Sequence, residues 1–372
     1  MAEGSFAREY TRPNMEIRTL AAQERLKFAD LLDDWRLAEG WTAGDRFRYQ
    51  VEFDPTWSDE NVFVAVEQGR LLGGVSILPR QLRVLGHSIP TGGISNLFTA
   101  SPLRRRGIAT DLLERAAETL RLRGFELAIV FPGAPPATSG YFEKRGFVGW
   151  SGQQSILRVD PEASLRGAAT DPGDITLEPV ASENERALQS IKAIHAAYAA
   201  SRSGTILRDD AHWRACFHLS PAPFDEFWLA RRGGLAVAYG RAAILDDVLT
   251  ATEIGRFEDG ADGLAKLIVH LLEPRAEDPL LRGAIASRIT SRELRSFLVL
   301  PTFDDIGLTV ALEHRGVRSH PMDDARASVR CINLTALASR LDVDLLRGED
   351  GAGFLRRILP PDGMVYWPSD RF

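Results

Sequence analysis

The pattern of apolar and polar positions in the first half of the chain alternates between the periods of strands and helices. Strands are expected at residues 15–20, 89–100 and 125–132, with a hairpin at 61–78, helices at 22–39 and 43–53, and a short helix followed by a strand at 140–150. Strands alternating with helices, through both hairpins and crossovers, indicate a mixed sheet.

The clearest helical period begins after residue 107. Apolar residues recur at helical spacing on one face, at Ile108, Leu112, Leu113, Ala116 and Leu120. Gly124 ends the pattern, as glycine commonly does just beyond a helix. We therefore expect an amphipathic helix with this face buried.

The second half repeats the same order of elements. It offers a hairpin at 227–242, a strand at 249–257, a helix at 259–272, a buried strand at 294–301, and a segment at 311–317 that echoes 141–147. Such repetition indicates one fold used twice. The last residues, 354–372, predict a helix, a turn and a final strand.

A segment rich in Pro, Gly, Ala and Asp separates the halves, as a linker would. We therefore expect a domain at residues 1–159, a linker at 160–175 and a second domain at 176–372. The fold class expected for each domain is α/β (α+β), with a mixed and mostly antiparallel sheet flanked by helices.

Composition and charge narrow the class of protein. Hydrophobic residues make up 44% and charged residues 26%, which is a globular composition. A net charge of −6 argues against a nucleic-acid partner and favours cationic small molecules. With no apolar signal core or membrane-length apolar stretch, no membrane partner and a cytoplasmic location are expected. Cys216 and Cys331 predict two reduced thiols, and no metal-ligand spacing stands out.

Three consecutive arginines stand in front of the amphipathic helix. A helix N-terminus already carries unpaired N–H groups and partial positive charge, so Arg104, Arg105 and Arg106 are unfavourable there unless an anion binds. Gly107 permits close approach of a ligand to the backbone, and Ala109 keeps the next turn small. This arrangement predicts a pyrophosphate. The alternative is that the arginines are ordinary solvated surface.

The segment from Arg104 to Ala109, after a strand and before a helix, resembles the acyl-CoA pyrophosphate loop of the GNAT acetyltransferase superfamily. The strand at 125–132 and the closing segment at 141–147 follow in that family's order, so the resemblance covers residues 15–158. It implies acetyl-CoA as acyl-donor cosubstrate, and no metal. It also implies that Leu97, Phe98 and Thr99 offer backbone groups to the pantetheine arm, although strand packing explains Leu97 and Phe98 equally well. The pyrophosphate would be held by Arg104, Arg105, Arg106, Gly107, Ile108, Ala109 and Thr110.

The tandem arrangement resembles the enhanced-intracellular-survival (Eis) group of acetyltransferases. In the second copy, Phe257, Glu258, Asp259 and Gly260 stand where the first copy has its arginines. Two carboxylates at a helix entrance suit the helix dipole but repel a pyrophosphate. We therefore expect a degenerate second copy and one cofactor, bound by the first. The Eis group forms hexamers, which implies a possible homo-oligomer that no residue here specifies.

The sequence leaves open which group protonates the leaving thiolate. In the GNAT family a tyrosine four residues before the closing glycine commonly does so, but that position is Phe142, and Tyr141 lies one residue earlier. A shift of one residue rotates a helical side chain by about 100°. Tyr141 is expected either to donate the proton or to pack or line the substrate site, in which case water protonates the thiolate.

The acceptor side offers two further hypotheses. Resemblance to the Eis group implies that the C-terminal carboxylate of Phe372 acts in the first unit's active site; the alternative is that the last strand only caps the second domain's sheet. Glu52 and Asp54 are either solvated loop residues or part of a pocket for a cationic amine. Aromatic residues nearby in the sequence would line that pocket, namely Trp41, Phe53 and Trp57.

These features predict an acyl-CoA-dependent N-acyltransferase that moves an acetyl group to a primary amine of a small molecule by direct attack in a ternary complex. Two alternatives remain open. A non-catalytic acyl-CoA sensor would bind the cofactor without transferring its acyl group. An aminoacyl-tRNA-dependent transferase would need a basic face for RNA, and the overall charge speaks against it.

Overall fold

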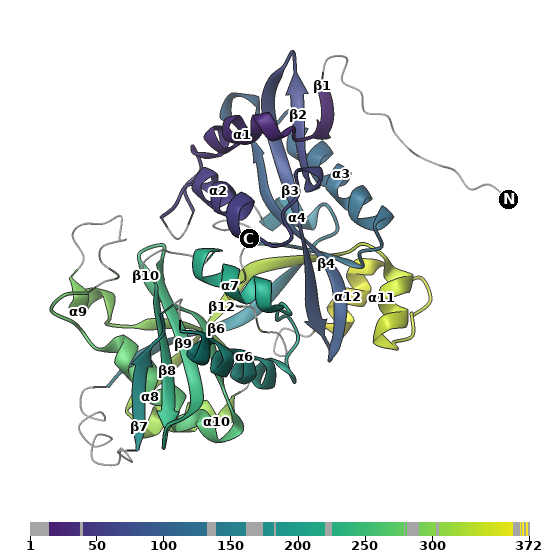
Figure 1. Cartoon of the computed structure of the whole chain (residues 1–372). Coiled ribbons are helices and arrows are strands. Elements are labelled where there is room, and N and C mark those ends of the chain that lie inside the picture. Colours follow the sequence, from purple (N-terminus) through teal and green to yellow (C-terminus); the bar gives the residue numbers. More distant parts are fainter. Residues whose placement is uncertain are drawn as a thin grey trace.

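A computed structural model describes residues 15–37, 40–131, 139–160, 174–181, 184–219, 225–278, 280, 290–302, 305–359, 365, 367 and 370 (Figure 1). Its strands form one 12-stranded mixed sheet in the order β1-β2-β3-β4-β5-β12-β6-β11-β10-β9-β8-β7. Among these strands, β4 with β5 and β10 with β11 are the parallel neighbours, so the mixed and mostly antiparallel sheet is confirmed.

The strands are β1 (Met15–Thr19), β2 (Val62–Glu67), β3 (Arg70–Val84), β4 (His87–Thr99), β5 (Leu127–Val130), β6 (Val148–Val159), β7 (Ile175–Pro179), β8 (Glu226–Arg232), β9 (Leu235–Leu245), β10 (Val248–Arg256), β11 (Leu298–Thr302) and β12 (Val317–Cys331). The helices are α1 (Arg25–Leu32), α2 (Ala43–Phe53), α3 (Ile108–Leu122), α4 (Ser139–Glu143), α6 (Glu185–Ala199), α7 (Asp210–Leu219), α8 (Ala261–Leu272), α9 (Ser291–Leu294), α10 (Ile306–His314), α11 (Leu334–Leu341) and α12 (Gly351–Ile358). We call the part built on β1–β5 the first unit and the part built on β7–β11 the second unit.

The two units exchange their last strands. β12, from the second half of the sequence, lies between β5 and β6, and it pairs with β5 from Ser328 with Val130 onward. β6, from the first half, pairs with β11 on its other side. Counting both shared strands, each unit has a seven-stranded sheet, and the two sheets are continuous through β6 and β12. The predicted linker falls largely on residues 161–173, outside the described residues.

Helices cover both faces of the first unit's sheet. The five apolar residues predicted to share one face of α3 are all buried, against residues of β2, β3, β4 and β5. On the opposite face, α1 and α2 cover β2 and β3. Further along that face, α11 and α12 pack on Leu127 and Ile129 of β5. The residues that alternate with these two along β5, Ala128 and Val130, face α3.

The helix predicted over residues 22–39 is shorter than expected. α1 ends at Leu32. Beyond it, Arg36 and Thr42 form an isolated antiparallel bridge, and Leu37 N donates to Trp41 O at 2.9 Å. Asp33 stops the helix because its carboxylate accepts from Thr42 Oγ1 at 2.7 Å, at the start of α2. α2 has the predicted bounds, since Thr42 caps it.

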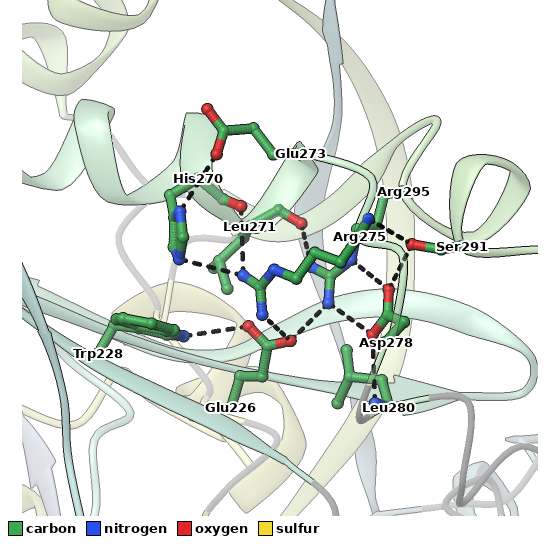
Figure 2. Close-up of polar contacts among 10 residues, drawn as sticks. All are labelled: Glu226, Trp228, His270, Leu271, Glu273, Arg275, Asp278, Leu280, Ser291 and Arg295. Atoms are coloured by element: carbon green, nitrogen blue, oxygen red, sulfur yellow. Dashed lines mark hydrogen bonds and ion pairs between the residues drawn. The ribbon is translucent and has the colours of Figure 1, made fainter.

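A buried ionic cluster fixes the second unit between α8 and β11 (Figure 2). Arg295 binds Asp278 and Glu226, with its Nε 2.5 Å from Asp278 Oδ2. Arg275 also binds Glu226, at 2.8 Å, and its Nη2 lies 3.1 Å from His270 Nε2. Each charge in the cluster has a partner of opposite sign. The cluster therefore joins the segment between α8 and β11 to β8, and we do not interpret it as a ligand-binding site.

None of the helices in the described ranges is long and apolar enough to cross a membrane. Within the same ranges, no group of three His, Cys, Asp or Glu side chains is arranged to hold a metal ion. Cys216 and Cys331 are both free thiols.

Candidate functional site

The parallel strands β4 and β5 separate part-way along their length. They pair from Thr91 with Leu127 to Ile94 with Val130. Beyond this point β5 ends, whereas β4 continues to Thr99 and pairs with β3. The predicted pantetheine contacts at residues 97–99 therefore lie where the sheet opens.

A bulge in β4 lies beside this opening. The pairing with β3 shifts register between Ser95 and Phe98, and Asn96 has a left-handed backbone with a φ of +53°. The Asn96 side chain is buried, and its Nδ2 donates to Gln50 Oε1 at 2.8 Å and to Ser76 Oγ at 3.1 Å. These bonds offset the cost of the left-handed conformation and join α2 to the strand. The only sequence signal for this feature is that asparagine tolerates the conformation better than most residues.

The side chains of Leu97 and Phe98, two of the predicted β4 residues, pack in the protein core. Phe98 is buried among residues of α1, α2 and β2, and its ring stacks on Trp35 at a centroid distance of 6.3 Å. Leu97 packs against the cluster beneath α3. The Thr99 carbonyl accepts from Arg104 Nε at 3.3 Å. Leu97 and Phe98 can therefore offer a ligand backbone groups rather than side chains, whereas the buried Thr99 Oγ1 has no hydrogen-bond partner among the described residues.

The arginine turn leads directly into α3. Arg105 and Gly107 have positive φ, of +62° and +81°. Gly107 is the N-cap residue, and its carbonyl accepts from the N–H groups of Thr110 at 3.0 Å and Asp111 at 3.1 Å. In the described part of the chain, the N–H groups of residues 107–109 meet no backbone acceptor. They are available to an anion at this helix end.

The protein neutralises the arginine turn poorly. Arg104, Arg105 and Arg106 are all exposed. Arg106 Nη2 lies 3.9 Å from Glu67 Oε1, which is the outer limit of an ion pair. The positive charge of the turn thus adds to that of the helix dipole, and an anionic ligand would remove the repulsion.

Phe142 and Tyr141 occupy different environments on α4. Phe142, at the position where the GNAT family commonly has its acid, is buried beneath α3 and packs edge-on against Phe147 at 5.4 Å. The Tyr141 hydroxyl is fully covered beside Thr110 of α3. Burial raises the pKa of the Tyr141 hydroxyl, so it stays protonated at neutral pH. A ligand can touch this oxygen only after the ring has moved.

The face covered by α2 contains a buried ion pair that the sequence did not predict. Asp54 ends α2, and its Oδ2 lies 2.5 Å from Arg80 Nη2 on β3. Although burial opposes ionisation, the charge of Arg80 holds the pKa of the Asp54 carboxyl below its ordinary value. Asp54 is therefore neither a solvated loop residue nor free for a cationic amine, and both predictions for it are wrong. Glu52 is exposed, as one of its two alternatives requires.

Two of the three predicted pocket aromatics lie together. Trp41 and Phe53 both contact Tyr49 of α2, with ring centroids at 4.6 Å and 5.7 Å. Trp57 does not join this ladder, because it packs edge-on against Phe47 in the core beneath α2.

Residues of the second unit pair with β3 of the first unit through their backbones. Leu207 N donates to Gln81 O at 2.8 Å, so the segment before α7 runs along β3. Arg208 Nη2 lies 2.9 Å from Glu253 Oε2 and 2.7 Å from Asp370 Oδ1. Asp370 is thus anchored to Arg208, the residue that follows Leu207. Phe372, the predicted carboxylate, lies outside the described residues.

The equivalent helix entrance of the second unit is occupied by its own arginine. Arg256 donates to the carbonyls of Phe257 at 3.0 Å and Glu258 at 2.7 Å, and it pairs with Asp305 at 2.6 Å. A guanidinium bound to these carbonyls and this carboxylate has its charge already neutralised. This entrance therefore lacks the unneutralised arginines that distinguish the first unit.

Residues 16–148 match the family model described as an acetyltransferase (GNAT) domain. No curated protein sequence matches the chain.

Among solved structures, a GCN5-related N-acetyltransferase from Anabaena variabilis is similar with a TM-score of 0.58 and 16% identity, over 86% of this chain and 73% of that chain. Eis1 from Mycobacterium abscessus is similar with a TM-score of 0.56 and 18% identity, over 88% and 76%. The Saccharomyces cerevisiae N-myristoyltransferase with bound myristoyl-CoA has a TM-score of 0.50 and 12% identity, over 86% and 79%. At these identities the likeness shows a shared fold, which extends over both units.

Proposed function

We propose that this chain transfers an acetyl group from acetyl-CoA to a primary amine of a small molecule. The premise is that residues 16–148 match a GNAT acetyltransferase domain and that the chain is an N-acyltransferase. The observation that carries this proposal is the poorly neutralised arginine turn at the N-terminus of α3, next to the opening between β4 and β5. A pyrophosphate would neutralise the turn, and the pantetheine arm would bond backbone groups of β4 on the side where β5 has ended.

The reaction we propose is direct attack in a ternary complex. The neutral amine nitrogen bonds to the thioester carbonyl carbon, the carbon–sulfur bond breaks, and the amine loses one proton while the thiolate gains one. No covalent enzyme intermediate is needed. This suits the two cysteines, because burial raises the pKa of the Cys216 thiol and raises that of Cys331 to about 11, which leaves neither as a thiolate at neutral pH.

Tyr141 is the proposed donor of the thiolate's proton. Its hydroxyl is protonated at neutral pH, and the family position beside it is filled by the core residue Phe142. Since the hydroxyl is covered in this structure, donation requires the ring to turn away from Thr110. Water is the alternative donor, and the two are separated by a substitution discussed below.

The acceptor we propose is a cationic amine. The net charge of −6 favours such a partner, and the aromatic ladder of Trp41, Tyr49 and Phe53 with exposed Glu52 on the same helix supplies groups that attract cations. Asp54 takes no part, because Arg80 already holds its charge.

The experiment that tests the function is a thiol-release assay with acetyl-CoA and a panel of primary amines. Thiol release that depends on one amine, with the acetylated amine found by mass spectrometry, supports the proposal. Tight binding of acetyl-CoA without release for any amine would indicate a sensor instead. Binding to RNA that weakens steeply with salt would indicate the aminoacyl-tRNA-dependent alternative.

A further inference from the structure

One guanidinium joins α4 to the first turn of α3. Arg145 follows α4; its Nη1 donates to the Tyr141 carbonyl at 2.7 Å and its Nη2 donates to Thr110 Oγ1 at 2.6 Å. The guanidinium carbon also lies 3.7 Å from the centre of the Tyr141 ring. Because the two residues are four apart, they share one side of the helical turn. Arg145 therefore clamps the Tyr141 ring against α3.

The contact on α3 is next to the candidate phosphate site. Thr110 is the third residue of the helix, and its own N–H bonds the Gly107 carbonyl at 3.0 Å. The free N–H groups of residues 107–109 lie in the same turn. The ends of helices fray unless side chains hold them, so a tie at Thr110 limits the directions in which these N–H groups can point.

Arg145 forms no ion pair within the part of the chain that the structure describes. Within the described residues its hydrogen-bond partners are two uncharged oxygens, and its Nε is buried without a partner. Besides burial, two carboxylates of α3, Asp111 and Glu114, act on the neighbouring Tyr141 hydroxyl and help to raise its pKa, and Glu114 pairs with Arg330 at 3.0 Å. A partly buried cation beside a helix N-terminus is unfavourable by both burial and the helix dipole. A bound anion would remove both costs.

We propose that Arg145 is a positioning residue for the diphosphate of acyl-CoA. It fixes the first turn of α3 through Thr110 and adds a fourth guanidinium to Arg104, Arg105 and Arg106. The inference rests on the proposed function and deepens its cofactor site. It gives the contact between Arg145 and Tyr141 a role in phosphate binding that is separate from proton transfer.

The test compares Arg145→Gln with the wild type on two acyl donors and one inhibitor. Acetyl-CoA carries the diphosphate, S-acetylpantetheine lacks it, and inorganic pyrophosphate is the phosphate group alone. We expect kcat/KM for acetyl-CoA to fall about tenfold through KM, and the pyrophosphate inhibition constant to rise about tenfold, as for one lost charge-assisted hydrogen bond. For S-acetylpantetheine, kcat/KM should change by less than about twofold, since that donor has no diphosphate to bind at the arginine turn.

Arg123→Gln is the matched control. Arg123 is exposed at the opposite end of α3 and bonds the Asn61 side chain, so its loss should leave all three quantities unchanged. A melting temperature above the assay temperature shows that each variant is folded.

Equal losses with both donors, or an unchanged pyrophosphate constant, would overturn the inference, because Arg145 would then act through the fold or through Tyr141 alone. The proposed function fails in a different way. If the wild type released no thiol with any amine, yet pyrophosphate still competed with CoA in calorimetry and Arg145→Gln weakened that competition, the transferase would be lost and Arg145 would keep its assignment.

Discussion

At the residue scale, Phe142 is a core residue at the position where the GNAT family commonly has its acid. Its ring is enclosed by apolar residues beneath α3, where a hydroxyl would need a hydrogen-bond partner that this cluster does not supply. Tyr141, one residue earlier, points instead at Thr110. The only tyrosine of α4 therefore lies one residue before the position of the family's acid, at the edge of α3.

Tyr141→Phe separates the two candidate proton donors. If Tyr141 protonates the thiolate, kcat should fall about a hundredfold and the loss of activity at high pH should disappear, because that limb reports the raised pKa of the hydroxyl. Activity carried by the protonated tyrosine is present below that pKa and lost above it. A pH–rate profile measured with acetyl-CoA checks this, and an unchanged profile would assign the proton to water.

At the element scale, the arginine turn places three exposed cations at the positive end of α3, which is unfavourable in the ligand-free protein. Replacing Arg104, Arg105 and Arg106 together by glutamine removes three cations from the positive end of the helix. We expect the ligand-free protein to become more stable, by about 0.3–1 kcal/mol per residue, while its affinity for CoA falls by at least tenfold.

Thermal unfolding and calorimetry measure the two effects of this triple substitution. Their opposite signs distinguish a binding site from a surface that merely tolerates arginine. A variant that loses stability and keeps its CoA affinity would contradict the proposal that the arginine turn binds the pyrophosphate. Arg123→Gln serves again as the control at the other end of the helix.

The sequence predicted elements well where their causes are local. α2 has its expected bounds because Thr42 and the apolar period act within a few residues, and α3 buries the predicted face. α1 was predicted too long because Asp33 is recruited by Thr42, beyond the helix. The bulge at Asn96 and the clamp at Arg145 depend on partners 46 and 35 residues away, which no local pattern contains.

At the scale of the whole molecule, the repeat was visible in the sequence but the strand exchange was not. Nothing in the composition of β12 shows that it pairs with β5 of the first unit, because that pairing depends on contacts between distant segments. The two helix entrances also differ in charge, since Arg256 and Asp305 bond each other at the second one.

That difference predicts one cofactor per chain. Isothermal titration with acetyl-CoA should give a stoichiometry near one, and the triple arginine variant should remove that single event. Two equivalent sites, or a residual site of unchanged affinity in the variant, would show that the second unit binds the cofactor despite its acidic entrance at Glu258 and Asp259.

The strand exchange makes the first unit depend on the second for its own fold. A chain of residues 1–160 keeps the residues that match the GNAT domain model but lacks β12, which separates β5 from β6, and lacks α11 and α12, which cover Leu127 and Ile129. It would expose the edge of β5 and part of its core, so we expect no cooperative thermal unfolding and no CoA binding. Joining residues 317–359 to the same chain through a flexible linker restores the missing strand and both helices, and should recover both properties. Cooperative unfolding of residues 1–160 alone would mean that the first unit can complete its sheet without the exchanged strand.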